Sequence, residues 1–158
     1  MNENLKYWIA LRMEDGVGGV VTKKLMAEFG SPELLFTSNK SELSRVNKVV
    51  ERNPEKIIEA LKGFSDWDKV DQEIGRAEKL GFNILTLDDP GYPEPLLNIY
   101  NPPPVLYVKG SMVPEDALSI AIVGTRMPDR YGRTITETLS GGLAARGITI
   151  VSGHGARY

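Results

Sequence analysis

Two apolar segments on either side of a helix-length stretch constrain the fold of this chain more than any other feature. Residues 119–124 and 149–153 are short runs rich in isoleucine and valine, typical of strands buried on both faces of a parallel sheet. The stretch between them carries a large apolar side chain at every fourth position: Tyr131, Ile135, Leu139 and Leu143. This spacing predicts a helix over residues 129–146, in which Gly141 and Gly142 allow close approach to the sheet. Because parallel strands need a crossover connection, the sequence predicts a strand–helix–strand unit and an α/β fold.

The first half of the chain has the pattern of short helices joined by capped turns. Apolar side chains recur at helical spacing in three segments: residues 3–13, 20–29 and 66–80. Ser31 and Asn53 each precede a proline, which places a polar capping residue before proline at the first helical position. We expect one helix to start at each of these caps, and another short helix to begin at Ser41.

The pattern changes after Gly81, a residue suited to the left-handed end of a helix. Residues 82–87 and 105–110 are strand candidates, and the three prolines at 102–104 between them must be extended. We therefore expect two domains, a helical one over residues 1–81 and an α/β one over residues 82–158.

Composition narrows the possible functions. The chain has 158 residues, of which 41% are hydrophobic and 25% charged, as in ordinary globular proteins. It has no cysteine and one histidine, His154, so thiol chemistry is excluded and little material remains for a metal centre or a histidine base. Neither a membrane-spanning run nor a secretory signal is recognisable, which predicts a cytoplasmic protein without membrane contact.

Charge is distributed unevenly along the chain. The formal net charge is −2, but residues 120–158 contain five arginines against two acidic residues, a local excess of +3. The planar guanidinium of arginine suits bidentate contact with phosphate, whereas lysine predominates in the rest of the chain. The alternative interpretation is that these arginines form a solvated face of a helix.

The carboxyl ends of the two parallel strands are the candidate site. Gly124, Thr125 and Arg126 follow the first strand, and Ser152 and Gly153 end the second, so we expect them at one edge of the sheet. An arginine and a hydroxyl beside a helix N-terminus predict an anion pocket there. A dinucleotide fingerprint would need glycine in place of Arg126, so we expect no nicotinamide or flavin cofactor. The alternative is a structural loop with an arginine that only contributes solubility.

A glycine-rich hairpin at residues 15–19 joins two of the predicted helices and resembles a helix-hairpin-helix. Such hairpins can offer backbone N–H groups to DNA phosphates. Because Glu14, Asp15 and Glu28 offset Lys23 and Lys24, a helical turn in a protein-interaction module is the slightly preferred alternative.

Five motifs in register resemble the DprA family, also called Smf, the DNA-processing proteins of bacterial natural transformation. They are Phe-Gly-Ser-Pro-Glu at 29–33, Leu-Thr-Leu-Asp-Asp-Pro-Gly-Tyr-Pro at 85–93, Pro-Pro-Pro-Val-Leu-Tyr-Val-Lys-Gly at 102–110, Ile-Ala-Ile-Val-Gly-Thr-Arg at 120–126 and Val-Ser-Gly at 151–153. The resemblance implies a helical domain of sterile-alpha-motif (SAM) type, followed by an extended Rossmann-like parallel sheet of which this chain holds the first part. Because family members are longer, we expect the chain to be a fragment, or to be completed by a partner.

The resemblance also implies a function. Family members bind single-stranded DNA without strong sequence preference, protect it as it enters the cell during competence, and help to load the RecA recombinase for DNA recombination. They are not known for turnover, so we expect no catalytic residue, metal or cofactor, and a homodimer of the full-length protein. The family's DNA-binding loop maps onto Gly124, Thr125 and Arg126, and its second strand-end motif begins at Ser152 and Gly153.

Two other functions are compatible with the same fold. A Rossmann-like enzyme of the lysine-decarboxylase-like or nucleotide phosphoribohydrolase group would share a strand-end phosphate site, but the Pro-Gly-Gly motif of that group, followed by Gly-Thr and a catalytic glutamate, does not occur here. Alternatively, the helical residues 1–81 act as a protein-docking module.

Overall fold

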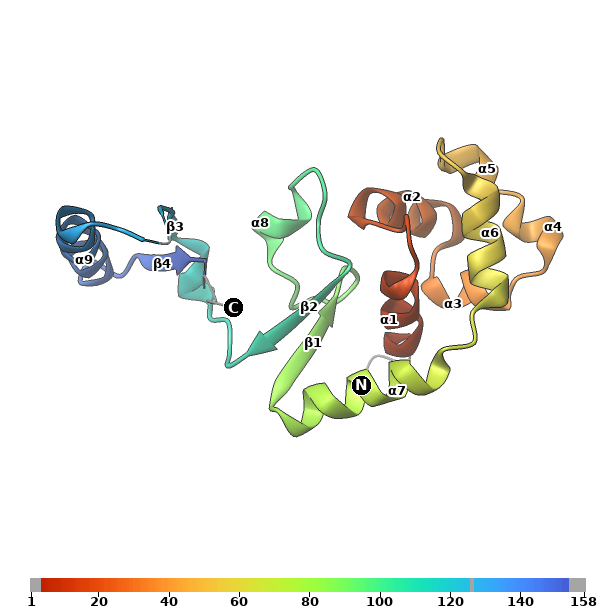
Figure 1. Ribbon diagram of the computed structural model, residues 1–158, viewed down its shortest axis with the longest axis horizontal. Helices are drawn as coiled ribbons and strands as arrows, with labels where there is room; N and C mark the ends of the chain where they lie inside the picture. The colour runs from red at the N-terminus through yellow and green to blue at the C-terminus, as the bar shows by residue number, and fades with distance from the viewer. Residues whose placement is uncertain (1–3, 126, 154–158) are drawn as a thin grey trace. The chain divides into compact units, whose positions relative to one another are not determined.

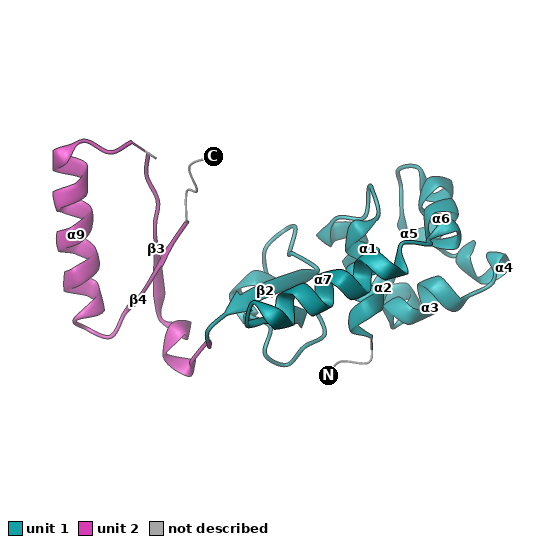
Figure 2. Ribbon diagram, turned by 60° about the horizontal axis from the view of Figure 1, so that its bottom comes forward, with its two compact units in different colours: residues 1–110 teal, residues 111–158 magenta. Residues whose placement is uncertain are grey.

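The computed structural model describes residues 4–125 and 127–153, and the chain divides into two compact units, Met1–Gly110 and Ser111–Tyr158 (Figure 1 and Figure 2). The first unit is mainly helical, and the second combines a two-stranded sheet with one described α-helix. Within the described ranges, no helix is long and apolar enough to cross a membrane. An α/β fold with a helical region before a parallel strand pair is thus confirmed.

The N-cap side chain is bonded at two of the helices described in the first unit, whereas the side chain of Asn53, a predicted cap, makes no such bond. The first unit has eight described α-helices. They are α1 (Leu5–Met13), α2 (Gly19–Phe29), α3 (Pro32–Thr37), α4 (Lys40–Leu43), α5 (Val46–Val49), α6 (Pro54–Gly63), α7 (Trp67–Lys79) and α8 (Glu94–Leu97). Ser31 caps α3 as predicted, since its Oγ accepts from the Leu34 N–H at 3.4 Å. The helix expected from Ser41 starts one residue earlier, because Asn39 and Glu42 form a reciprocal capping box, with bonds of 3.0 and 2.8 Å.

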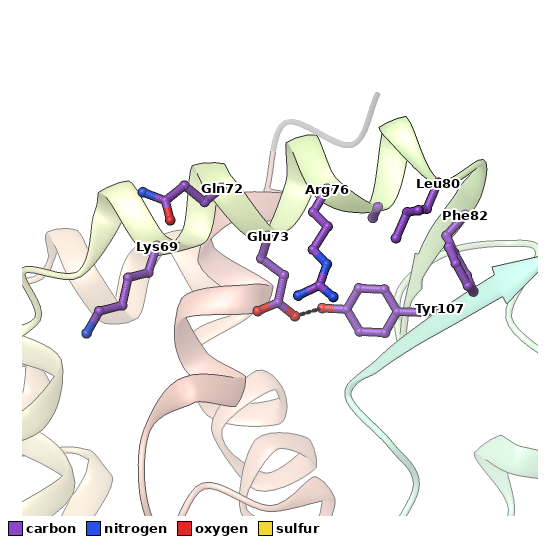
Figure 3. Close-up of a pocket in the computed structure, with 8 residues that line it drawn as sticks. Lys69, Gln72, Glu73, Arg76, Leu80, Phe82 and Tyr107 are labelled. Atoms are coloured by element: carbon purple, nitrogen blue, oxygen red, sulfur yellow. Dashed lines mark hydrogen bonds between the residues drawn. The ribbon is translucent and has the colours of Figure 1, made fainter. Parts of the chain in front are cut away.

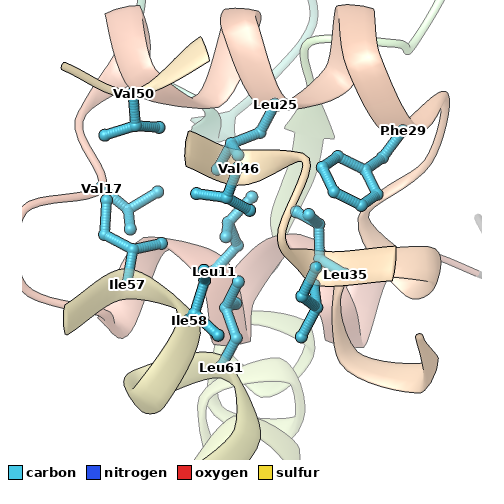
Figure 4. Packing of buried hydrophobic residues seen from close by; sticks show 11 residues of the cluster. Leu11, Val17, Leu25, Phe29, Leu35, Val46, Val50, Ile57, Ile58 and Leu61 are labelled. Carbon is cyan, nitrogen blue, oxygen red and sulfur yellow. The ribbon is translucent and has the colours of Figure 1, made fainter. Parts of the chain in front are cut away.

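Two apolar clusters hold these helices together. The larger, shown in Figure 4, draws on several helices and on the turn before α2: Leu11, Val17, Leu25, Phe29, Leu35, Leu43, Val46, Val50, Ile57, Ile58 and Leu61. The second joins Leu5, Ile9 and Ala10 of α1 to Val70 of α7, and half-buried aromatic rings pack against it. Since α1 contributes side chains to both clusters, the apolar face of this helix is broad. It is the helix that joins the two clusters.

The strands β1 (Phe82–Thr86) and β2 (Val105–Lys109) form an antiparallel hairpin, with Phe82 opposite Lys109. This hairpin contacts α7 and α1, so the first compact unit continues to Gly110. The sequence division after Gly81, which has a left-handed φ of +72°, coincides with the change from helices to strands. As a boundary between domains it stays a prediction.

A polar network fixes β2 to the helices (Figure 3). The Tyr107 hydroxyl of β2 donates to Glu73 of α7. The same carboxylate oxygen pairs with Nη2 of Arg12 of α1, which the figure does not draw, at 2.5 Å. Burial first, and then the bond to Glu73, raise the pKa of Tyr107 to about 12. Glu73 and Tyr107 also line a hollow of about 490 Å³ between α7 and the hairpin.

The glycine hairpin before α2 packs against the segment that leads into β2. A Cβ built on Gly19 would lie 1.9 Å from the Pro102 carbonyl oxygen, so only glycine fits there. The Asn101 side chain completes the contact, since its Oδ1 accepts from the Val20 N–H at 3.1 Å. The N–H of Val20, the residue that follows the hairpin, is therefore used within the chain by a residue far away in sequence.

In the second unit, the strand–helix–strand prediction is confirmed. A 3₁₀ turn, η1 (Pro114–Ala117), precedes β3 (Ser119–Ile122), α9 (Arg130–Ala144) and β4 (Thr149–Ser152). The two strands are parallel and in register, with Ser119 opposite Thr149 and Ile122 opposite Ser152. Asp116 of η1 ties the turn to β4, because its carboxylate accepts from the Thr149 hydroxyl at 2.9 Å.

Two expectations about the packing of this unit were wrong. The strands are not buried on both faces, since Ile120 and Val151 are 41% and 50% exposed. Gly141 and Gly142 do not approach the sheet either, because an added Cβ would meet nothing at the first and only the Arg146 guanidinium, at 3.7 Å, at the second. The reason is physical: α9, the only α-helix described in this unit, cannot cover both faces of a sheet by itself.

Candidate nucleic-acid interface

The parallel register of β3 and β4 brings their carboxyl ends together. Because Ile122 lies opposite Ser152, the loop with Gly124 and Thr125 and the residue Gly153 leave the sheet at the same edge. We call Gly124, Thr125, Arg126, Ser152 and Gly153 the strand-end edge. The structure describes four of these five residues, and Arg126 lies outside the described residues.

The two glycines of the strand-end edge have no packing reason to be glycine within the described chain. Neither has a left-handed φ, and a Cβ added at Gly124 or Gly153 would have no heavy atom within 4 Å. Space above the backbone is instead what a ligand needs if it is to approach main-chain N–H groups closely.

The start of α9 is capped by the protein itself. Asp129 Oδ1 accepts from the Gly132 N–H at 2.7 Å, and Thr125 Oγ1 accepts from the Met127 N–H at 3.2 Å. A phosphate at this helix end would therefore face a carboxylate as well as the favourable helix dipole. Anion binding at the edge must come mainly from arginine side chains rather than from the helix terminus.

Sequence reasoning missed the first turn of α9 as part of this interface. Arg130 and Arg133 are both exposed, and in the part of the chain that the structure describes neither guanidinium has an ion-pair partner. Tyr131, whose spacing with Ile135, Leu139 and Leu143 is typical of a buried helix face, is 74% exposed beside them. The sequence signal for this basic surface is the spacing of the two arginines, because residues three apart on a helix share a face.

Within residues 4–125 and 127–153, His, Asp and Glu side chains do not form a group of three or more that could hold a metal ion. The described chemistry of the strand-end edge and the first turn of α9 together is thus that of two arginines, two hydroxyls, an exposed phenol ring and open backbone. Such a set suits binding of a phosphate-containing ligand.

Comparison with known proteins places this arrangement in a family. Residues 83–157 match the family model described as DNA recombination-mediator protein A. The chain is 32% identical, over 98% of its length, to Protein Smf of Synechocystis sp., and 34% identical over 88 residues to DNA processing protein DprA of Bacillus subtilis. The chain belongs to the DprA/Smf family. The matched region contains all but the first residue of β1, the strands β2 to β4 and the strand-end edge, so the family resemblance read from the motifs is confirmed.

The DprA/Smf relatives extend well beyond the matched region. A further relative, Protein Smf of Borreliella burgdorferi, is 28% identical over 77% of the chain. The alignments cover 39%, 30% and 40% of the Synechocystis, Bacillus and Borreliella proteins. This DprA/Smf chain thus corresponds to at most about two-fifths of those relatives. The name of the Bacillus protein refers to DNA processing and the description of the family model to DNA recombination, and neither names a reaction.

Proposed function

We propose that this DprA/Smf chain binds single-stranded DNA at the strand-end edge, in DNA uptake and recombination. The observation that carries the proposal is the meeting of the β3 and β4 carboxyl ends beside an arginine-bearing first turn of α9. The class of ligand comes from the description of the family model, which refers to DNA recombination, and from the name of the Bacillus relative, which refers to DNA processing.

The chemistry of the edge supports a ligand with alternating phosphates and bases. Arg130 and Arg133 supply exposed cations for phosphates, and the motif resemblance adds Arg126. The exposed ring of Tyr131 supplies a stacking surface that accepts any base. Contacts of this kind do not distinguish sequences, because phosphates and the faces of bases are common to all of them.

The resemblance supports a fuller role. We propose that the protein works in the cytoplasm during natural transformation, protects incoming single strands and helps to load the RecA recombinase, with homodimerisation in the full-length protein. We also propose that it acts by binding and not by catalysis. Turnover of nucleoside monophosphates by the purified protein would overturn that last part and favour the phosphoribohydrolase-like alternative.

Fluorescence anisotropy of a labelled oligothymidylate tests the strand-end edge. The wild-type chain should bind in a salt-dependent manner, and Arg126→Ala, Arg130→Ala and Arg133→Ala should each weaken binding. Each phosphate contact that is lost should reduce the slope of log affinity against log salt by about 0.7. Arg146→Ala is the matched control, because its guanidinium bonds the Gly142 carbonyl oxygen at 2.6 Å near the other end of α9. Absence of binding by the folded wild-type chain, or equal loss in the control, would refute the proposal.

A further inference from the structure

A second basic surface lies in the first unit, away from the residues of the strand-end edge in sequence. It is a groove of about 490 Å³ between α2 and the start of α6, which we call the α2–α6 groove. Its floor is apolar and includes the half-buried Val20, Val21 and Val49. Its volume lies in the range of small-molecule and cofactor sites, which is enough for a nucleotide unit.

Positive charge gathers around this groove although the unit that contains it is acidic. Residues 1–110 hold 14 basic and 17 acidic residues, yet the lining has Lys24, Arg52 and Lys56 against Glu51 alone. Lys24 pairs with Glu51 at 3.0 Å, and this contact lowers the Glu51 pKa. Arg52 and Lys56 are exposed and have no ion-pair partner among the described residues, so two cations are available to an anionic ligand.

An aromatic ring completes the lining. Tyr100 is 88% exposed, the highest exposure among the large apolar side chains that the structure describes as exposed. Water is a poor environment for such a ring, and stacking on another flat ring would cover it. Its position is held, because the next residue, Asn101, is bonded to the Val20 N–H of α2 and Pro102 packs against Gly19.

We propose that the α2–α6 groove is a second contact surface for single-stranded nucleic acid. Arg52 and Lys56 contact backbone phosphates, and a base stacks on Tyr100. An acidic peptide would use the cations but would leave the ring without a partner, so the exposed aromatic favours nucleic acid. The inference rests on the proposed function for the class of ligand, and it concerns residues that the strand-end edge does not include.

The test uses the full chain, a labelled oligothymidylate and anisotropy at several salt concentrations. Tyr100→Ala should weaken binding about 5- to 150-fold, the range that stacking of one base allows, while Tyr100→Phe should bind as wild type. The double variant Arg52→Ala/Lys56→Ala should reduce the salt slope by about 1.4, at about 0.7 for each phosphate on a single strand. A bromodeoxyuridine oligonucleotide crosslinked by light should attach at Tyr100, which peptide mass spectrometry would locate.

Matched controls separate the groove from general charge effects. Lys62→Ala removes an exposed cation from α6, the helix that carries Lys56, and Lys40→Ala removes one from α4. Both should leave binding unchanged. A loss of affinity in these controls equal to that in the groove variants would overturn the inference, because it would show only a dependence on net charge.

Arg126→Ala, measured in parallel, separates failure of the groove from failure of the strand-end edge. If Arg126→Ala abolishes binding and the groove variants do not change it, the groove inference is overturned and the proposed function stands. If the groove variants lose binding and Arg126→Ala does not, the inference stands and the strand-end site is wrong. If the wild-type chain does not bind, both fail. If the groove variants lose binding only to a polyglutamate peptide, the occupant is an acidic peptide and the inference is again overturned.

Discussion

Replacing Gly19 with alanine tests whether the glycine hairpin is a packing device. The added Cβ would lie 1.9 Å from the Pro102 carbonyl oxygen and 2.9 Å from Asn101 Oδ1, whereas ordinary contacts begin at 3.4 Å. The segment must therefore move by about 1.5 Å, the difference between 3.4 and 1.9 Å. A shift of that size would also break the bond between Asn101 and the Val20 N–H, which is now 3.1 Å long.

The expected cost of Gly19→Ala combines two losses. Forcing an extra carbon into a packed contact costs about 1–3 kcal/mol, and a typical hydrogen bond contributes about 0.5–1.5 kcal/mol. The greater helix propensity of alanine offsets up to about 1 kcal/mol of these losses. We expect a net loss of about 2–3 kcal/mol in the free energy of unfolding of the first unit.

Urea unfolding followed by tryptophan fluorescence measures this loss directly, because both tryptophans, Trp8 and Trp67, belong to the first unit. With a denaturant slope of about 2 kcal/mol/M, the midpoint of Gly19→Ala should fall by about 1–1.5 M. Gly75→Ala is the matched control, since Gly75 lies inside α7 and an added Cβ meets nothing within 4 Å. That variant should be more stable by up to about 1 kcal/mol. A Gly19→Ala midpoint at or above the wild-type value would refute the packing argument.

Two further predictions follow from single side chains. The pKa of Tyr107 is raised to about 12, above the value of about 10 in an unfolded chain. The contribution of the Tyr107 hydroxyl to stability is therefore complete below pH of about 10 and is lost as the pH rises from there to about 12. In urea midpoints measured across this pH range, Tyr107→Phe should flatten the loss of stability, and an unchanged loss would contradict the assignment. Asp129 caps α9 by accepting from the Gly132 N–H, so Asp129→Ala should lower the stability of the helix by about 1 kcal/mol. Asp129→Asn keeps the cap but removes the negative charge, and should therefore tighten oligothymidylate binding at low salt. Weaker binding of Asp129→Asn would count against the strand-end edge.

Local chemistry was predictable from the sequence, because it depends on residues a few positions apart. The cap at Ser31 and the left-handed glycine at 81 follow from side-chain and backbone preferences that act within one turn. The parallel pairing of β3 and β4 follows from two apolar runs separated by a helix. The start of α4 lies one residue before the predicted one because Asn39 caps the helix together with Glu42, a reciprocal pairing that the prediction did not consider.

Burial and long-range contacts were not predictable in the same way. An apolar run shows that a strand is suited to burial, but burial also requires other elements to cover it, and Ile120 remains 41% exposed. Tyr131 has the spacing of a core residue and faces water for the same reason. The α2–α6 groove combines residues near positions 20 and 50 with Tyr100, and no local pattern links those three regions.

The glycine hairpin shows how structure changes the interpretation of a motif. A hairpin that offers backbone N–H groups to phosphate needs those donors free. The Val17 N–H within the hairpin is bonded to the Glu14 carbonyl oxygen at 3.2 Å, and the Val20 N–H that follows it is bonded to Asn101. Gly19 is required by its contact with Pro102. The same contacts hold Tyr100 at the rim of a groove that carries Arg52. We therefore expect nucleic-acid contact on this face to depend mainly on side-chain cations and stacking. Binding through it should consequently weaken steeply with salt, and it should change little when a hairpin residue is altered in a way that preserves the fold.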